Sequence, residues 1–403
     1  MNQSDILAIA DWVARAALDG EPEGALVDGF CARARGAGLP LARAVVFIDT
    51  LHPVHEGRAL LWRAGEGLVK ATDYGRTVRG EGLERWQQMP HYDLRESGAT
   101  DLRLVPEPGS RYEILREMHA DGMTDYLAMI HRFAPAGALG EMDCCYSSFI
   151  TDRPGGFDEA EIAAFRRLKP HLALGVKSVA LRRVASTLVE TYLGRDAGRR
   201  VLEGQIERGV ADWIEAVLWF SDLRDFTRIA DGCEPHAVIG LLNDYADAVI
   251  SAVHAHGGDV LKLMGDGVLA IFTAEGRCGA ALAAASEARA RVAVLNGRRA
   301  AAGEPTTGLY LGLHLGEVFY GNIGSTERLD FTVVGPAVNE VSRIAALCRS
   351  LDQPILLSSA FAEAVDGDGR LVGVGRYALR GVKRPQELFT IEEAADEAAS
   401  DAA

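Results

Sequence analysis

The sequence is poor in cysteine and has no CxxC motif of the kind that indicates a disulfide framework or a zinc site. Its six cysteines are Cys31, Cys144, Cys145, Cys233, Cys278 and Cys348. Cys144 and Cys145 fall in a predicted strand, where neighbouring side chains alternate between the two faces. We therefore expect structural thiols at this pair and not a redox couple.

Long apolar runs are also missing. No run approaches the roughly 18 residues that a membrane helix needs, and the runs 44–48 and 268–272 have the length of buried strands. The first twenty residues lack a basic start and carry Asp5 and Asp11 within an apolar stretch, which predicts an amphipathic helix and not a signal peptide. We expect no membrane insertion and a cytoplasmic location.

Basic residues are in the minority, with 42 Lys and Arg against 57 Asp and Glu and a formal net charge of -15. Nucleic acids and anionic membranes bind basic faces, because such faces release counterions. The balance argues against nucleic acid as a main partner. An anionic substrate would have to bring its own cations.

The chain does contain enough apolar material for sizeable cores, with 48% hydrophobic and 25% charged residues. Its 403 residues exceed what one core usually supports, so we expect two domains. The predicted boundaries place a first domain at residues 1–175 and a helical connector at 176–212. A second domain follows at 213–393, and a flexible tail at 394–403.

The first domain mixes predicted strands at 44–49, 125–130 and 145–149 with a long closing helix for which Asp158 is a plausible N-cap. The stretch SSFITDRPGGFDEAEIAAFRRLKPHLALGVKSVALRR resembles the last strand and closing helix of GAF domains, which are small-ligand sensors. The resemblance implies an α+β regulatory domain that receives an unknown small-molecule or protein signal. An unrelated α+β domain that serves only to dimerise is the alternative.

The connector begins with leucines spaced seven residues apart, at Leu174, Leu181 and Leu188. This spacing suits a short parallel coiled coil, and an amphipathic helix packed on its own domain explains it equally well. The glycines in LGRDAGRRVLEGQIERG then predict a break in the helix.

The second domain shows two aspartates at predicted strand ends. A strand at 214–221 leads to Asp222, a helix follows at 234–256, and Asp266 lies between two apolar runs in a Gly-Asp-Gly turn typical of a hairpin. Converging carboxylates form the oxygen pocket that Mg²⁺ prefers, and paired metals suit in-line displacement at phosphorus. Taken singly, Asp222 could be a helix cap and Asp266 an ordinary turn residue.

Four motifs occur in order between about 216 and 391: FSDLRDFT, LKLMGDG, GLHLGEVFYGNIGSTERLDFTVVGPAVNEVSR and YALRGVKRPQELFTI. Together they resemble the class III adenylate and guanylate cyclase catalytic domain. The resemblance implies an α+β fold with a ferredoxin-like βαββαβ core. It also implies a head-to-tail homodimer in which each active site uses both chains.

The resemblance assigns roles to individual residues. It makes Asp222 and Asp266 the ligands of two Mg²⁺ or Mn²⁺ ions, with ATP as the substrate. A backbone segment would cradle the triphosphate with its N–H groups, and it consists of Leu223, Arg224, Asp225, Phe226 and Thr227. Asp225 departs from the glycine that the family often has, and its charge beside a triphosphate should weaken binding unless the side chain points away.

Recognition of the base would fall to Lys262, where guanylate cyclases usually carry Glu, because a lysine can donate to adenine N1. Thr332 stands where many adenylate cyclases have Asp, and a bacterial subgroup with Thr there still uses ATP. Asn339 and Arg343 would orient the ribose and stabilise charge on the α-phosphate.

Two further basic residues, Arg380 and Lys383, lie where the family places a phosphate-reaching cation. Both could instead be solvated. His314 and Glu317 sit at scaffold positions and are expected to be structural. The predicted function is adenylate cyclase. The alternatives are a guanylate cyclase, which Lys262 argues against, and a silent nucleotide-binding scaffold, which would normally have lost one of these site residues.

Overall fold

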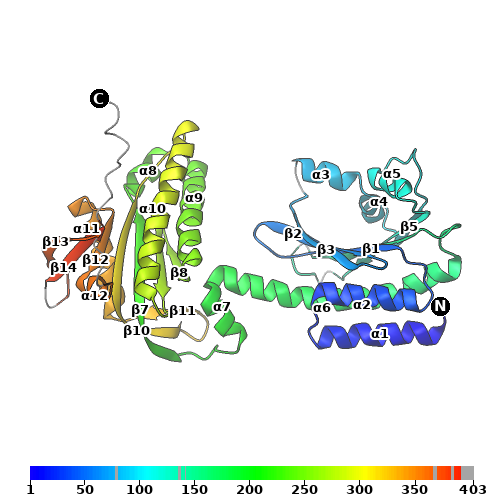
Figure 1. Cartoon of the computed structure of the whole chain (residues 1–403), viewed down its shortest axis with the longest axis horizontal. Coiled ribbons are helices and arrows are strands. Elements are labelled where there is room, and N and C mark those ends of the chain that lie inside the picture. Colours follow the sequence, from blue (N-terminus) through cyan, green and yellow to red (C-terminus); the bar gives the residue numbers. More distant parts are fainter. Residues whose placement is uncertain (78–79, 135–137, 141, 366–369, 383–384, 392–403) are drawn as a thin grey trace. The chain divides into compact units, whose positions relative to one another are not determined.

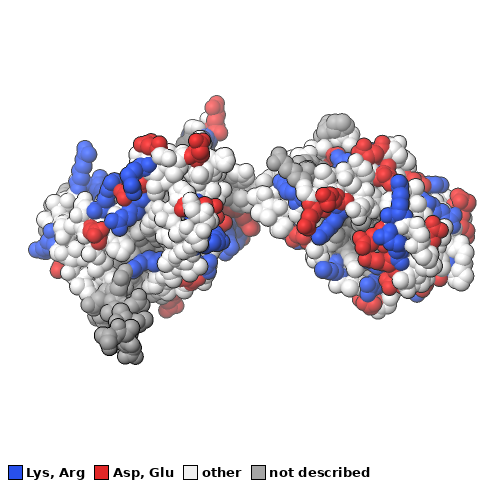
Figure 2. Space-filling model, turned by 90° about the horizontal axis from the view of Figure 1, so that it is seen from above, with Lys and Arg blue, Asp and Glu red and all other residues white. Residues whose placement is uncertain are grey.

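The computed structural model describes residues 1–77, 80–134, 138–140, 142–365, 370–382 and 385–391. The chain divides into two compact units, Met1–Leu188 and Val189–Ala403. Figure 1 shows the elements of each unit, and Figure 2 shows acidic and basic side chains interspersed on the face of each unit that it presents. Within the described residues, every helix is too short or too polar to traverse a lipid bilayer.

The first unit is built on a six-stranded antiparallel sheet with the order β3-β2-β1-β6-β5-β4. Its strands are β1 (Arg43–Asp49), β2 (His55–Arg63), β3 (Gly67–Gly75), β4 (Asp101–Leu104), β5 (Asp125–Arg132) and β6 (Cys144–Thr151). Its helices are α1 (Gln3–Leu18), α2 (Glu23–Gly36), α3 (Gly80–Gln87), α4 (Pro90–Glu96), α5 (Glu113–Ala120) and α6 (Glu159–Leu193). The three strands predicted from the sequence are confirmed as β1, β5 and β6.

Helices cover both faces of this sheet (Figure 1). The helices α1, α2 and α6 pack on one face, where residues such as Phe30, Val46 and Phe165 form the larger core. The helices α4 and α5 contribute to a smaller core on the other face, which includes Leu94 and Leu115. The central strands β5 and β6 are therefore buried on both sides, whereas β3 at the edge of the sheet is largely exposed.

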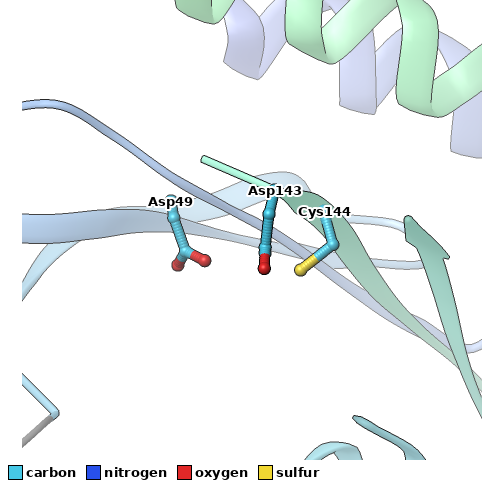
Figure 3. A group of neighbouring side chains, drawn as sticks. All are labelled: Asp49, Asp143 and Cys144. Atoms are coloured by element: carbon cyan, nitrogen blue, oxygen red, sulfur yellow. The ribbon is translucent and has the colours of Figure 1, made fainter. Parts of the chain in front are cut away.

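The adjacent cysteines lie in different cores, Cys145 in the larger and Cys144 in the smaller. Their predicted alternation across a strand is confirmed, and both thiols are buried. Cys144 begins β6 beside the end of β1, so that Asp49, Asp143 and Cys144 come together there (Figure 3).

The closing helix α6 runs without interruption from Glu159 to Leu193 and spans the division between the units. Asp158 caps its start as predicted, since its Oδ1 accepts the Glu161 N–H at 2.8 Å. Val176 and Ala180, from the predicted connector, lie in the core of the first unit. Ala197, from the same predicted segment, lies in a core of the second unit, so the 176–212 segment is divided between them.

The second unit is an α+β fold on an eight-stranded sheet with the order β13-β14-β12-β10-β7-β9-β8 and with β11 paired to β10. The strands are β7 (Ala211–Leu223), β8 (Asp259–Met264), β9 (Gly267–Phe272), β10 (Leu309–Gly324), β11 (Leu329–Val334), β12 (Ile355–Ser358), β13 (Leu371–Tyr377) and β14 (Gln386–Ile391). The helices are α7 (Arg195–Leu202), α8 (Phe226–Gly232), α9 (Pro235–Ala255), α10 (Arg277–Ala301), α11 (Pro336–Leu351) and α12 (Ser359–Ala364).

The elements β7, α9, β8, β9, α10 and β10 form the predicted βαββαβ core, with the short helix α8 between β7 and α9 and with β10-β7-β9-β8 as the order in the sheet. Alternate residues of β7 face different cores. Val217 and Trp219 pack with α9 and α10, whereas Ala216 and Leu218 pack in the core that α11 covers. This alternation places Asp222, an even-numbered residue of β7, on the α11 face of the sheet.

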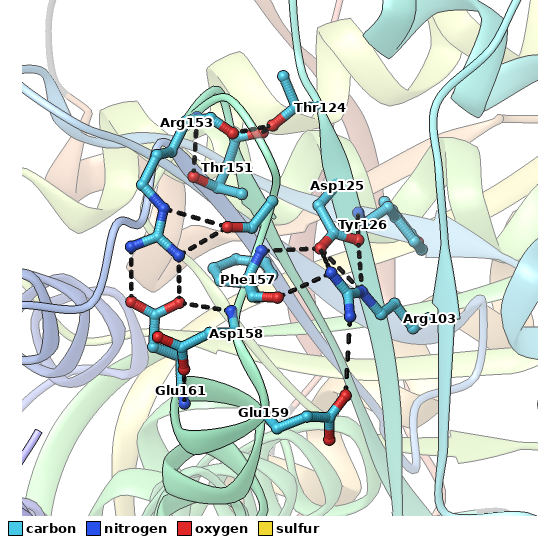
Figure 4. Close-up of polar contacts among 11 residues, drawn as sticks. Arg103, Thr124, Asp125, Tyr126, Thr151, Arg153, Phe157, Asp158, Glu159 and Glu161 are labelled. Atoms are coloured by element: carbon cyan, nitrogen blue, oxygen red, sulfur yellow. Dashed lines mark hydrogen bonds and ion pairs between the residues drawn. The ribbon is translucent and has the colours of Figure 1, made fainter.

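A buried polar clasp joins the start of α6 to the sheet of the first unit (Figure 4). Asp125, only 1% exposed, accepts bonds from Arg103 Nε at 2.9 Å and from the Phe157 N–H at 2.8 Å. Arg103 donates onward to the Phe157 carbonyl at 2.7 Å. Gly156 lies at a φ of +73°, and a Cβ there would collide with the Asp125 carboxylate.

We predict that Asp125→Ala destabilises the chain by about 1–3 kcal/mol, because it leaves the buried Phe157 N–H without an acceptor and removes one partner of Arg103, whose side chain is 37% exposed. Urea unfolding would measure the difference. The control is Glu81→Ala, which breaks an ion pair with Arg85 whose partners are both more than 80% exposed, and it should cost about 0–1 kcal/mol. Equal losses in the two variants would mean that the clasp does not stabilise the fold.

Candidate active site

Two carboxylates meet at one end of the central strands of the second unit. Asp222 is the next-to-last residue of β7, and Asp266 is the second residue of the two-residue turn that joins β8 to β9. Gly265 makes this turn possible, since it lies at a φ of +67°. The pairing of Ser221 with Val268 in the antiparallel β7–β9 ladder then brings the two aspartates side by side.

The two aspartates share one backbone donor. The Leu223 N–H lies 3.0 Å from Asp222 Oδ1 and 3.3 Å from Asp266 Oδ2. Burial, together with the hydrogen bond and the charge of Asp266, raises the pKa of Asp222 to about 7. Neighbouring hard oxygen donors of this kind, which destabilise each other's ionised form, suit a divalent cation that relieves the repulsion.

The segment predicted to cradle a triphosphate, 223–227, leads from β7 into the seven-residue helix α8. Its first two N–H groups are already bonded within the chain. That of Leu223 faces the carboxylates, and that of Arg224 donates to the Gly308 carbonyl at 2.9 Å. In the nucleotide-free chain these two N–H groups therefore have partners of their own, and the phosphate-binding role of the segment 223–227 stays a prediction.

Asp225 combines an unusual backbone with a defined partner. Its φ is +55°, a left-handed conformation that favours glycine, which explains why glycine suits this position. Its Oδ1 accepts from the Arg349 guanidinium of α11 at 3.0 Å. The side chain is thus paired with a cation, which offsets the charge that would otherwise repel a phosphate.

The residues expected to recognise the base lie on β8 and β11. Lys262 Nζ donates to Asp330 Oδ2 at 2.6 Å, and the two side chains are 42% and 43% exposed. Thr332 is half-buried on the same strand as Asp330 and pairs with Gly321 of β10. Asp330 and Arg349 escaped the sequence-based prediction. In the sequence, Asp330 is marked only by its position two residues before Thr332. Arg349 lies outside all four motifs.

Asn339 and Arg343 lie one turn apart on α11, with Asn339 exposed and Arg343 half-buried. A Cβ at Gly381 would lie 3.5 Å from the Arg343 guanidinium nitrogens, so the segment that carries Arg380 passes beside Arg343. Arg380 is exposed, and Lys383 lies outside the described residues. Among the described residues, no hydrogen bond or ion pair joins the Asp222–Asp266 pair to Lys262, Asn339 or Arg343.

His314 is buried on β10 and shares a hydrogen bond of 2.9 Å with Ser358 Oγ. Burial lowers the pKa of His314 to about 4, so the ring is neutral near pH 7. This environment supports the structural role expected for it.

Residues 212–393 match the family model described as the adenylate and guanylate cyclase catalytic domain. The second unit therefore contains a class III cyclase catalytic domain. Adenylate cyclase 1 of Rhizobium meliloti (strain 1021) is 28% identical over 254 residues, which cover 60% of this chain and 38% of that protein. The adenylate cyclase of Anabaena cylindrica is 33% identical over 159 residues, which cover 38% of this chain and 32% of that protein.

Among solved structures, a bacterial light-regulated adenylyl cyclase is 26% identical and aligns over 45% of this chain and 91% of its own, with a TM-score of 0.41. The chain spans less than two fifths of the length of the two curated relatives. The matched range coincides with the sheet of the cyclase domain, from β7 to β14.

We predict that ionisation of Asp222 lowers the folding stability of the cation-free chain. The folded state keeps a proton on Asp222 up to about pH 7, whereas the unfolded state releases it near the ordinary pKa of 3.8. Stability from this group therefore falls as the pH rises through that window. In EDTA, Asp222→Asn should melt above the wild type at pH 8, and the difference should narrow toward pH 4.

The control for this melting experiment is Asp231→Asn, which neutralises an exposed acid of α8. It should follow the wild type at every pH. A melting difference for Asp222→Asn that does not change between pH 4 and pH 8 would contradict the raised pKa.

Proposed function

We propose that the chain is an adenylate cyclase that converts ATP to 3′,5′-cyclic AMP and pyrophosphate. The observation that carries the proposal is the meeting of Asp222 and Asp266 at the Leu223 N–H, within a cyclase catalytic domain. Two acids that meet at neighbouring strand ends form the oxygen donor set that Mg²⁺ or Mn²⁺ prefers when it binds a nucleotide.

Asp222 and Asp266 would hold two such ions, which when bound lower the pKa of the ribose 3′-hydroxyl and neutralise charge on the triphosphate. The N–H groups at the start of α8 would orient the phosphates, and Asn339 would hold the ribose so that its 3′-oxygen points at the α-phosphorus. Arg343 would meet the charge that develops on the α-phosphoryl oxygens as pyrophosphate leaves. Positioning and electrostatics supply the acceleration, and no side-chain base is required.

Selection of adenine is assigned to Lys262 and Thr332. Lys262 can donate to the unprotonated N1 of adenine, and guanine presents an N1–H at the same place, which a lysine cannot pair with. The ion pair with Asp330 holds the ammonium group at the end of β8, which limits the conformations that the lysine must lose when a base arrives.

A homodimer would complete the site. Trp213, Phe319 and Val334 face one another in register across β7, β10 and β11, and they remain 52%, 48% and 47% exposed. Neighbouring large apolar side chains at such exposure mark an interaction surface, and a second copy of the chain is the occupant that a shared active site needs.

The first unit offers a second element for dimerisation. Leu174 and Leu181, two of the leucines spaced by seven, are 66% and 37% exposed on α6. Their exposure favours the coiled-coil interpretation over packing on their own domain. We propose that this unit is regulatory and GAF-like, and that its signal acts on cyclase activity.

We predict that Asp222→Ala and Arg343→Ala are each inactive when expressed alone and that co-expression restores activity. In a shared-site dimer the mixed pair has one site with both lesions and one with neither. Random pairing should therefore recover about a quarter of the wild-type rate of cyclic AMP formation. If a demonstrated mixed dimer stayed inactive, the aspartates and the arginine would act within one chain.

We predict that Lys262→Glu lowers kcat/KM for ATP by roughly tenfold or more, because an acceptor replaces the donor and now faces Asp330. Purified variants would be assayed with ATP and with GTP. Lys70→Glu, an exposed reversal on β3 of the first unit, is the control and should keep the wild-type value. An unchanged kcat/KM for Lys262→Glu would remove this lysine from the base site.

A further inference from the structure

The first unit contains a cavity of about 1140 Å³ whose role is not explained by the proposed reaction. It lies on the sheet face opposite α1 and α2, and it is lined by residues of β1, β2, β3, β6, α3, α4 and α5 and of the segments beside them. This volume is ample for a small organic molecule. The lining has two parts, an aromatic wall and an acidic end.

The aromatic wall is a connected set of rings. Phe47 stacks on Tyr146 with ring centroids 5.1 Å apart, and Trp86 meets Tyr146 edge-on at 5.4 Å. Tyr92 packs against Trp86 at 6.3 Å. These rings come from β1, α3, α4 and β6, so that aromatic surface meets the cavity from the sheet and from the helices above it. Aromatic faces of this kind attract organic cations.

The acidic end lies where β1 finishes beside the start of β6 (Figure 3). Ligand atoms of Asp49, Asp143 and Cys144 all lie within 4.8 Å of one another. Asp49 is 6% exposed, and its Oδ1 accepts from Tyr74 Oη at 2.6 Å. Asp143 Oδ2 accepts from Arg95 at 3.1 Å, but its Oδ1 is buried without a hydrogen-bond partner. Two carboxylates at this range repel each other unless a cation or a proton intervenes.

The whole lining carries more acidic than basic residues. Three arginines face six acids, which are Asp49, Glu56, Glu96, Glu113, Glu117 and Asp143. One of these arginines, Arg95, is already engaged by Asp143 and by the Tyr146 hydroxyl. An anionic ligand would therefore enter an acidic cavity, whereas a cation would be attracted to it.

We propose that this cavity binds an organic ammonium ion, with the cationic head between Asp49 and Asp143 and an apolar or aromatic body against Phe47, Trp86 and Tyr146. The ammonium N–H groups would satisfy the orphaned Asp143 Oδ1 and separate the two carboxylates. In support, burial raises the pKa of Asp49 to about 7, which marks a carboxylate that gains from a nearby positive charge.

A metal ion fits the same atoms less well. Burial raises the pKa of the Cys144 thiol well above its usual range, and it is the thiolate that binds metals. The remaining donors would be two carboxylates that already accept hydrogen bonds from Tyr74 and Arg95. An organic cation needs neither a thiolate nor a full coordination shell.

Isothermal titration of the full chain tests the proposal directly, without reliance on cyclase activity. The probes are three primary amines with different bodies: phenethylamine, tryptamine and 3-phenylpropylamine. The matched neutral and anionic probes are 2-phenylethanol, indole-3-ethanol and 3-phenylpropionate. We expect at least one amine to bind with a stoichiometry of one per chain, and its neutral or anionic counterpart to bind at least about tenfold more weakly.

Asp49→Asn should weaken binding of that amine at least about tenfold, since the amide keeps an acceptor for Tyr74 but removes the charge. Glu117→Gln is the matched control, because it removes one charge from an exposed acid of the lining and should change the affinity by less than about twofold. Asp143→Asn serves as the second variant, and circular dichroism would establish that each variant is folded.

Four outcomes would overturn the proposal. Neutral or anionic probes could bind as tightly as the amines, or none of the three amines could bind. Alternatively, Zn²⁺ or Mn²⁺ alone could bind one per chain in a manner lost in both Asp49→Asn and Cys144→Ser, which would make the acidic end a metal site. An amine affinity that Asp49→Asn leaves unchanged would likewise show that the acidic end does not hold the cation.

Discussion

The antiparallel register of β7 against β9 is the constraint on which the catalytic unit depends. Ser221 pairs with Val268, so Asp222 and the turn residue Asp266 are brought to the same end of the sheet and share the Leu223 N–H. A slip of one residue would turn Asp222 to the other face and bury it against α9 and α10. Side-chain size opposes that slip, because the fully buried Trp219 would leave the core against α9 and α10 and change places with the smaller side chains of the α11 face.

This arrangement is opposed by electrostatic repulsion between the carboxylates of Asp222 and Asp266, and the same repulsion favours the binding of cations. Two carboxylates held close together disfavour their own ionisation, which is visible in the raised pKa of Asp222. The basic side chains nearby neutralise other acids, since Arg349 pairs with Asp225 and Lys262 pairs with Asp330. These ion pairs leave the central pair in need of cations, which a nucleotide substrate brings with it.

The first unit repeats the same physical situation with a different solution. Asp49 and Asp143 also approach each other at the ends of neighbouring strands, and again burial and like charge raise the pKa of one carboxyl group. Here aromatic rings surround the acids, and an arginine already engages one of them. The hard oxygen site of the cyclase domain suits metal ions, whereas the aromatic surroundings of Asp49 suit an organic cation.

Local patterns in the sequence determined the α+β class, the strands β1, β5, β6 and β7, the cap at Asp158 and the hairpin that presents Asp266, because turns, caps and alternating apolar residues act over a few positions. Tertiary structure alone decided the partners of Asp225 and Lys262, the two engaged N–H groups of the predicted phosphate cradle and the cavity beside Asp49. Arg349 lies 124 residues from Asp225, and Asp330 lies 68 residues from Lys262. No periodicity or spacing in the sequence predicts such pairs, because only the packing of α11 on the sheet and the pairing of β11 with β10 bring their side chains together.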